Sequence, residues 1–438
     1  MALTIVRAQS WYDPALAHTR IQMVEVPAND AAAETPALTG EQRRLASGLW
    51  LTYALYYIGR VNLSPALVPM AAALGLSRAE VGVIGSALFW SYGLGHLING
   101  QLGNRYRPRV IVGVGLAVTA AVNLLFGFQT ALLAMTALWA INGFAQSTGW
   151  SPILRILSER LGVEASKRLS VFFSMSYAVG AAVSLALAGW LVTQWGWSSA
   201  FLVPGIILAI GCALWWLSRA DAPPPVERQP LIRGMGRDAR RLWPVLTGAA
   251  FMGFAYSGSQ LWMPALLTDT GLVPEAFAGS LSGLMALLSA GGMLIAGFVL
   301  RRSGNPLGVM RGFLAVLAAG ALLAAVTTGT AQIAGVTVMM FTLGAVMALL
   351  LTSLPLAYAG PGRISSVSGI ASAAQYVGGG LAGVLVGAAI DGIGWGGVLL
   401  LWAGCALVTL ALSGMVERVA GKAGPSNAED VGPPVTDG

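Results

Sequence analysis

Apolar stretches of membrane-spanning length recur along the whole chain, and they constrain its fold more than any other feature. Hydrophobic residues make up 56% of the 438 residues and charged residues only 10%, against roughly a quarter charged in soluble domains. A helix of ~20 apolar residues crosses the hydrocarbon core of a bilayer. The sequence therefore predicts an all-α integral membrane protein with twelve transmembrane spans. We place these spans at 45–70, 80–103, 109–128, 131–154, 168–192, 198–218, 243–268, 276–300, 308–328, 331–358, 365–390 and 395–416.

The basic residues gather in alternate connections between these spans. The connections after spans two, four, six, eight and ten hold arginines or lysines, whereas the opposite connections hold one basic residue, Arg78, with the acids Asp269, Glu275 and Asp391. Connections rich in Lys and Arg face the cytoplasm. We therefore predict a multi-pass protein of the cell inner membrane with both termini cytoplasmic. The net charge of +7 reflects this topology and does not indicate a nucleic-acid partner.

A basic, proline-rich connection divides the spans into two sets of six. We expect a cytoplasmic tail at 1–44, an N-terminal half at 45–218, a cytoplasmic linker at 219–242, a C-terminal half at 243–417 and a second tail at 418–438. A weak internal repeat supports the division, because Tyr177 of span five and Tyr376 of span eleven each precede a Gly-Trp pair at nearly equal offsets. Two parallel six-helix halves are the architecture of major facilitator transporters, which hold substrate between the halves.

One charged residue lies deep in a predicted span. Arg60 is more than two helical turns from either end of span one, and none of the 18 Asp and Glu residues falls near the middle of a span. A central arginine costs about 2.5 to 3.5 kcal/mol on insertion scales, so it is a functional candidate. Its planar guanidinium can donate two parallel hydrogen bonds to a carboxylate or phosphate. We predict that Arg60 binds an anionic substrate. The alternatives are an ion pair with a buried acid, and satisfaction by helix-end carbonyls and water.

His96 of span two is the second candidate. It either donates to the anion, or takes up a proton near neutral pH and couples transport to the proton gradient. The alternative is a neutral imidazole bonded to a neighbouring carbonyl. The other predicted substrate-binding residues are Tyr57, Tyr177, Tyr256, Tyr376 and Gln375. Packing between helices is the alternative for each of them, and we interpret Trp150 as an interface anchor or packing residue.

The sequence contains no signature of soluble catalysis or nucleotide binding. It has no Gly-x-x-x-x-Gly-Lys-Ser/Thr loop, and its His, Cys and acidic residues do not have metal-ligand spacing. We therefore expect neither an enzyme nor an ATP-driven pump, with no cofactor and no metal site. The expected partners are a small anionic substrate and membrane lipid, and we expect a monomer.

Motifs in five spans are similar to those of one transporter family. They are Tyr56-Tyr57-x-x-Arg60-x-Asn62, Ser91-Tyr92-Gly93, Asn142-Gly143-x-x-Gln146-x-x-Gly149-Trp150-x-Pro152, Trp262-x-Pro264 and Tyr376-x-Gly378-Gly379. Together they cover nearly the whole membrane region. The pattern resembles the organophosphate:phosphate antiporters of the major facilitator superfamily, which exchange glycerol 3-phosphate or hexose phosphates.

This resemblance implies roles for individual residues. Arg60 matches the span-one arginine that contacts the substrate phosphate, and Tyr376 matches a cavity tyrosine. His96 stands where the family has a lysine, and Tyr177 where it has a histidine. The family's second arginine, six residues before the Trp of Trp-x-Pro, is replaced by Tyr256.

The missing second arginine bears on the charge of the substrate. One guanidinium, one titratable His and several Tyr hydroxyls match a monoanion, such as a carboxylate or a singly ionised phosphonate, better than a phosphate dianion. We therefore predict secondary active transport of a small organic anion (carboxylate, phosphonate or organophosphate) by alternating access, as an antiporter or a proton-coupled carrier. The alternatives are a drug efflux transporter of the same fold and a transporter-like membrane sensor.

Overall fold

The computed structural model describes residues 38–102, 106–218, 220–222, 240, 242–355 and 364–422. The chain divides into two units after Gly40, and only residues 38–40 of the first unit are described. Within the described part of the second unit, all regular secondary structure is helical. The predicted all-α class is confirmed.

The helices follow the predicted spans in order. They are α1 (Gly40–Ile58), α2 (Leu63–Leu74), α3 (Arg78–Leu102), α4 (Pro108–Phe126), α5 (Leu132–Gln146), α6 (Trp150–Leu161), α7 (Val163–Trp195), α8 (Ser199–Leu217), α10 (Trp243–Asp269), α11 (Glu275–Ser303), α12 (Pro306–Val326), α13 (Gly329–Ala348), the π-helix η2 (Leu349–Ser353) and α15 (Ile364–Lys422). Spans eleven and twelve run together in α15, where Gly394 adopts a φ of 68° and bends the chain between them.

Two spans that we predicted as continuous helices are interrupted. In span one, α1 ends at Ile58, residues 59–62 form a turn, and α2 begins at Leu63. In span four, residues 147–149 separate α5 from α6. Hydropathy does not reveal such breaks, because they depend on side chains of neighbouring helices that bond the freed backbone groups.

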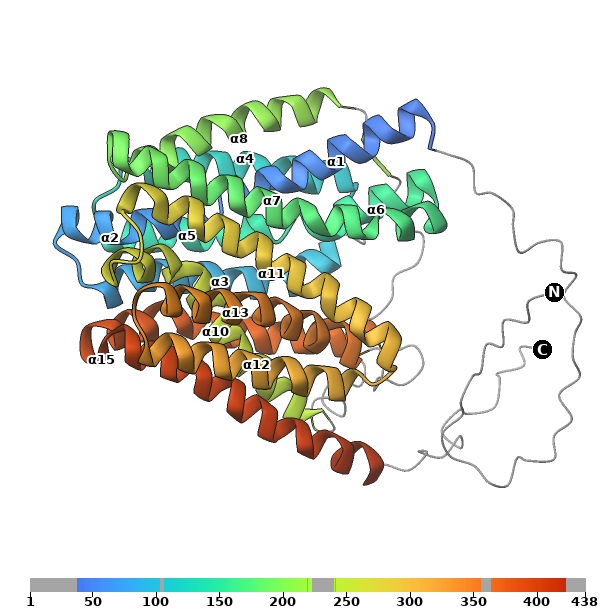
Figure 1. Ribbon diagram of the computed structural model, residues 1–438. Helices are drawn as coiled ribbons and strands as arrows, with labels where there is room; N and C mark the ends of the chain where they lie inside the picture. Colours follow the sequence, from blue (N-terminus) through green and yellow to red (C-terminus); the bar gives the residue numbers. More distant parts are fainter. Residues whose placement is uncertain are drawn as a thin grey trace, which may run out of the picture. The chain divides into compact units, whose positions relative to one another are not determined.

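The helices run side by side in two groups. Figure 1 shows α1–α8 in blue to green on one side and α10–α15 in yellow to red on the other. Across the division, α3 packs against α15, α7 against α11 and α2 against α10. The predicted arrangement of transmembrane helices in two six-helix halves is therefore confirmed.

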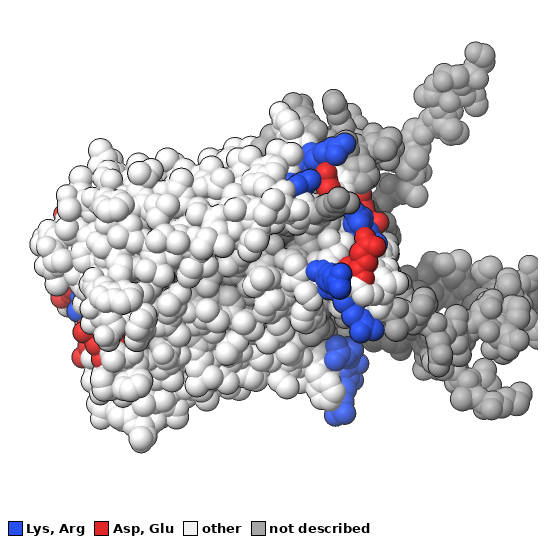
Figure 2. Space-filling view, turned by 90° about the horizontal axis from the view of Figure 1, so that it is seen from above, with Lys and Arg blue, Asp and Glu red and all other residues white. Residues whose placement is uncertain are grey.

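Charged side chains gather at the two ends of the bundle and leave an uncharged band between them (Figure 2). Within the described residues, seven helical segments meet a length and hydropathy criterion for crossing a membrane. We call one end the basic end, and it carries Arg107, Arg109, Arg155, Arg301 and Arg302. We call the other the acidic end, and it carries Arg78, Glu80, Asp269, Glu275 and Asp391. This pattern fits a chain that crosses the membrane many times.

The two halves are in close backbone contact towards the acidic end. A Cβ atom on Gly82 of α3 would overlap the backbone of Gly383 in α15, and a Cβ on Gly189 of α7 would lie 3.0 Å from Gly279 in α11. Small residues let helix backbones approach in this way. Within the C-terminal half, Trp262 of α10 donates from its Nε1 to the Gly383 carbonyl oxygen at 3.3 Å and so holds the α15 side of this contact.

Ion pairs join the halves at the same end. The Arg78 guanidinium, at the start of α3, lies 2.8 Å from the Asp269 carboxylate of α10 and 3.7 Å from the Asp391 carboxylate of α15. Trp395 Nε1 also donates to Asp269, at 3.0 Å. Among the ion pairs of the described residues, only those of Arg78 link the two halves. The interface is therefore closed at the acidic end.

Candidate functional site

A cavity of about 670 Å³ lies between the two halves. Its lining extends from Arg60 and Gln260 in the middle of the bundle towards the basic end, to Thr352 in η2 and Gly369 near the start of α15. All seven residues that we predicted as a substrate site line this cavity: Arg60, Tyr57, His96, Tyr177, Tyr256, Tyr376 and Gln375. Their proximity is a finding, whereas their role in binding stays a prediction.

Arg60 projects into the cavity from the turn between α1 and α2. Its backbone N–H bonds to the Tyr57 carbonyl oxygen, three residues back, at 3.2 Å, so the α-helical pattern lapses at this position. Its Cζ lies 4.0 Å from the ring centroid of Tyr92 and 5.2 Å from that of Tyr57. These distances are those of cation–π contacts.

Two protein partners were the alternatives to a substrate for the guanidinium of Arg60: a buried acid and helix-end carbonyls. Within the described residues, it forms no ion pair and no hydrogen bond to a carbonyl. Aromatic faces hold the cation in place without occupying its N–H donors. Those donors are therefore available to an anion in the cavity.

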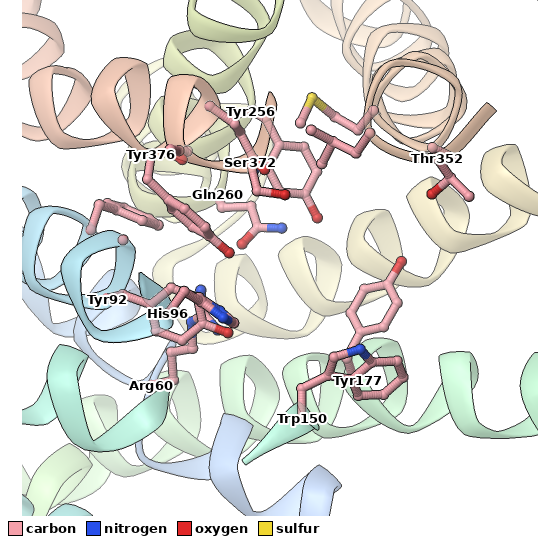
Figure 3. Close-up of a pocket in the computed structure, with 18 of the residues that line it drawn as sticks. Arg60, Tyr92, His96, Trp150, Tyr177, Tyr256, Gln260, Thr352, Ser372 and Tyr376 are labelled. Atoms are coloured by element: carbon pink, nitrogen blue, oxygen red, sulfur yellow. The ribbon is translucent and has the colours of Figure 1, made fainter. Parts of the chain in front are cut away.

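His96 is held by the same aromatic group. Its ring lies edge-on to Tyr92, at a centroid distance of 4.5 Å, and stacks on Tyr376 at 5.7 Å with an interplanar angle of 15°. Figure 3 shows Arg60, Tyr92 and His96 together on one wall of the cavity. The alternative of an imidazole bonded to a carbonyl finds no counterpart among the described residues. The ring nitrogens can therefore bond to a ligand or to water.

The facing wall comes from the second half and is neutral. Tyr256, Gln260 and Ser372 point into the cavity from this side (Figure 3). Tyr177 reaches across from the first half and donates its hydroxyl to Met293 Sδ at 2.8 Å. Among the lining residues, Arg60 is the one permanent charge, His96 is the one histidine, and no carboxylate is present. The site therefore offers a single fixed positive charge within neutral donors and apolar surface.

Several other lining residues were not predicted as site residues from the sequence. Tyr92, Trp150 and Gln260 are among them. We had named Tyr92 only as part of a motif, and we had not selected Gln260 as a site residue. We interpreted Trp150 as an interface anchor or packing residue, and its ring packs on Tyr53 at a centroid distance of 4.7 Å beside the cavity. A signal was available: Trp150 follows a Ser-Thr-Gly sequence at residues 147–149, where the helix is interrupted.

Comparison with known proteins identifies relatives of the whole membrane region. A family model described as the Major Facilitator Superfamily matches residues 49–383. A probable hexose phosphate transport protein of Chlamydia pneumoniae is 31% identical over 191 residues, which cover 42% of each chain. The membrane sensor protein UhpC of Escherichia coli is 27% identical over 209 residues, covering 45% of this chain and 47% of that one. The glycerol-3-phosphate transporter of Bacillus subtilis is 27% identical over 410 residues, covering 84% and 90%.

The matches differ in how much of each relative they include. The chain spans between 37% and 47% of the length of the first curated relatives that it matches. The predicted resemblance to the organophosphate:phosphate antiporters is confirmed by these relatives.

Solved structures agree on the fold. A bacterial homologue of the human lysosomal transporter Spinster, in an inward-facing and occupied conformation, superposes with a TM-score of 0.70 at 17% identity and covers 88% of this chain and 96% of its own. At that identity the likeness concerns the fold alone.

Proposed function

This chain belongs to the Major Facilitator Superfamily, and we propose that it carries a small organic anion across a membrane by alternating access. One observation carries the proposal: a guanidinium with no anionic partner among the described residues faces a cavity between the two halves. A charge in such a place is unfavourable unless it is paired. The substrate supplies the missing negative charge, and its carboxylate or phosphoryl oxygens accept from the Arg60 fork.

The charge of the cavity favours a monoanion. A phosphate ester carries about −1.5 to −2 at pH 7, whereas the lining offers one fixed positive charge. A carboxylate, a singly ionised phosphonate or the monoanionic form of an organophosphate leaves no uncompensated charge inside the membrane. The neutral wall around Gln260 and Ser372 would bond hydroxyl groups on the body of the same solute.

The test is ligand binding to the purified, full-length protein. A thermal-shift screen against small carboxylates, phosphonates and phosphate esters should find at least one stabilising anion. Arg60→Ala should abolish the shift, and Arg60→Lys should weaken it because an ammonium lacks the planar fork. Arg107→Gln is the control, since Arg107 pairs with Asp221 outside the cavity. If no anion stabilises the wild-type protein, or if Arg60→Lys retains full binding and uptake, the proposed role of Arg60 is wrong.

Coupling follows one of two schemes. In exchange, a second anion replaces the first at Arg60, and flux requires a counter-anion on the opposite side. In symport, His96 takes up the proton, and His96→Gln proteoliposomes should lose the acceleration that an inward proton gradient gives the wild type. Uptake that needs neither a counter-anion nor a pH gradient would exclude both schemes.

The proposal also covers the oligomeric state of the protein, its orientation in the membrane and the parts that move. We propose that the protein is a monomer in the cell inner membrane, with the basic end and both termini on the cytoplasmic side. The cavity then faces inward, since the interface is closed at the acidic end. We also propose that 45–218 and 243–417 are the moving halves. A transporter, and not an enzyme, is the function that the family supports.

A sensor is the second candidate, because a relative carries the name membrane sensor protein. The same cavity would then bind an anion without releasing it on the far side. Saturable binding to detergent-solubilised protein, together with no flux of the same labelled anion in proteoliposomes, would favour the sensor. Flux at a rate that falls with Arg60→Ala would favour the transporter over both the sensor and an efflux pump for apolar drugs.

A further inference from the structure

The turn that carries Arg60 leaves several backbone carbonyls without their helical partners. In a continuous helix, the carbonyls of Tyr56, Ile58 and Gly59 would accept from the N–H groups four residues on. Residues 59–62 are not helical, and the N–H of Arg60 turns to Tyr57 instead. Backbone groups without a partner are strongly disfavoured within a bilayer. The turn therefore needs donors from elsewhere in the protein.

Four side chains from three neighbouring helices supply those donors. Gln146 Nε2 donates to the Tyr56 carbonyl oxygen at 2.8 Å, and Ser184 Oγ donates to that of Ile58 at 3.1 Å. Asn142 and Asn123 both donate to that of Gly59, from their Nδ2 atoms, at 2.8 and 3.2 Å. We call Asn123, Asn142, Gln146 and Ser184 the carbonyl bracket. They come from α4, α5 and α7.

The carbonyl bracket is buried and lies behind the cavity. Asn123, Asn142 and Ser184 are at most 1% exposed and Gln146 is 3% exposed, and none of the four lines the cavity. Each carboxamide must present its nitrogen to the turn, because the opposite orientation would place two oxygens against each other. These side chains therefore act on the turn and do not touch a ligand in the cavity.

The turn also sets the direction of the Arg60 side chain. Along a helix each residue is rotated by about 100° from the one before it. If α1 continued through residue 60, the direction of the Arg60 side chain would be fixed by the rotation of α1. In the interrupted span that direction is decided by the turn, and the turn is held by the bracket. Asn62 ties the other end, since its Nδ2 donates to Asn123 Oδ1 and to the Ala200 carbonyl oxygen, both at 2.8 Å.

We infer that the carbonyl bracket consists of positioning residues, which fix the guanidinium of Arg60 for anion binding by holding an interrupted helix in one conformation. This inference rests on the proposed function for its effect on affinity, but not for its effect on the turn. Three measurements separate these consequences, and the first two do not need a known ligand.

The first measurement is hydrogen–deuterium exchange by mass spectrometry on the full-length protein. Asn142→Leu keeps a similar side-chain volume and removes the donor, so amides of a peptide covering residues 56–64 should exchange about tenfold faster. The matched control is Asn99→Leu. Asn99 is also a buried carboxamide, but its Nδ2 donates to Ser147 Oγ at 2.5 Å and to the Phe144 carbonyl oxygen at 3.5 Å, and not to a carbonyl of the turn. Exchange in residues 56–64 should be unchanged in this control.

The second measurement follows the guanidinium itself. Phenylglyoxal modifies arginine, and peptide mass spectrometry reads the modification of Arg60 against that of the exposed Arg107 in the same sample. Loss of the cation–π contact with Tyr92 in Asn142→Leu should raise the relative rate at Arg60 about fivefold. Unchanged exchange and unchanged labelling in Asn142→Leu would overturn the inference. If that variant does not fold, Ser184→Ala removes a single bond to Ile58 and should give the same direction in both readouts.

Affinity gives the third readout. Binding is measured with any anion that the thermal-shift screen identifies. Asn142→Leu should weaken that binding about tenfold or more, because a misplaced binding group loses much of its effect. Asn99→Leu should bind within about twofold of the wild type. If no anion binds the wild type, the proposed function fails, and the first two readouts still decide the bracket. If exchange and labelling respond while affinity does not, the bracket shapes the turn but does not position Arg60 for binding.

Discussion

The aromatic contacts of Arg60 lead to a prediction for a single residue. Tyr92 is 4% exposed, and its ring face lies 4.0 Å from the Arg60 Cζ. Tyr92→Leu removes the π-face and should weaken anion binding about threefold to fivefold, since a cation–π contact contributes ~0.5–1 kcal/mol or more. Tyr92→Phe retains the face and should bind within about twofold of the wild type. Isothermal titration with one anion compares the three proteins. A loss in Tyr92→Phe as large as that in Tyr92→Leu would show that the hydroxyl matters and the ring face does not.

The residues that could be predicted from sequence are those whose chemistry conflicts with their surroundings. Arg60 was identifiable because a charge deep in an apolar stretch is unusual, and His96 for a related reason. Tyr92 and Gln260 were not, because aromatic and amide side chains occur on every face of a membrane helix. Whether they reach the cavity depends on how each helix is rotated against its neighbours, and that rotation is set by packing between the halves.

A proline in α10 gives a prediction for an element. Pro264 has no N–H, so the Gln260 carbonyl, four residues back, lacks its helical donor. Ser64 of α2, in the other half, has its Oγ at 3.0 Å from the Gln260 oxygen and 2.7 Å from the Leu261 oxygen. Ser64→Ala should therefore destabilise the protein by about 1 kcal/mol, which is a fall of about 2 °C in the apparent Tm.

A double-mutant cycle isolates this role of Ser64. Pro264→Ala restores an N–H that can donate to Gln260, so the cost of Ser64→Ala in that background should fall below about half its value in the wild type. Thermal unfolding of the four proteins in one detergent gives the comparison. Equal costs in the two backgrounds would mean that Ser64 does not compensate for the proline.

At the scale of elements, hydropathy and charge placed the predicted spans close to the observed helices. Their ends agree within a few residues for α4, α8 and α10, where apolar stretches stop at Pro, Gly or charged residues. The interruptions of spans one and four were not predicted. Residues 56–63 contain no proline that would force a break, and the carbonyls that the break frees are bonded by amide donors from α4 and α5. Those donors are distant in sequence, so a local pattern could not reveal the break.

The molecule as a whole shows an asymmetry along its axis. The cavity extends from Arg60 towards the basic end, while the acidic end is closed by glycine contacts between α3 and α15, by Ser64, and by the ion pairs of Arg78. Alternating access requires that the closed end separate while the open end closes. The contacts at the acidic end are those that must break, so they set the balance between the two states.

The ion pairs of Arg78 lead to a prediction for the balance between the state closed at the acidic end and the state open there. It pairs with Asp269 and Asp391, and all three side chains are partly exposed. Pairs of that kind contribute ~0.2–1 kcal/mol each. Arg78→Gln should therefore raise the population open at the acidic end about threefold to fivefold. A cysteine at Ala278, which is 3% exposed and lines a cavity of about 360 Å³ beside Asp269 at that end, reports the opening through its rate of reaction with a membrane-impermeant maleimide.

The measurement needs a background in which Cys212 and Cys405 are replaced by Ser, and a control that breaks an ion pair within one half. Arg107→Gln serves as this control, because Arg107 pairs with Asp221 at 3.3 Å in the N-terminal half and at the basic end. Labelling at residue 278 should rise in Arg78→Gln and Asp269→Asn and not in Arg107→Gln. Raising the salt concentration to ~1 M should also accelerate labelling in the protein that retains Arg78, since exposed pairs are screened at that ionic strength.

The contradicting outcome is a labelling rate in Arg78→Gln no higher than in the Arg107→Gln control. In that case the helix contacts of Gly82 and Gly189 hold the acidic end closed without help from these charges, and packing alone governs its opening.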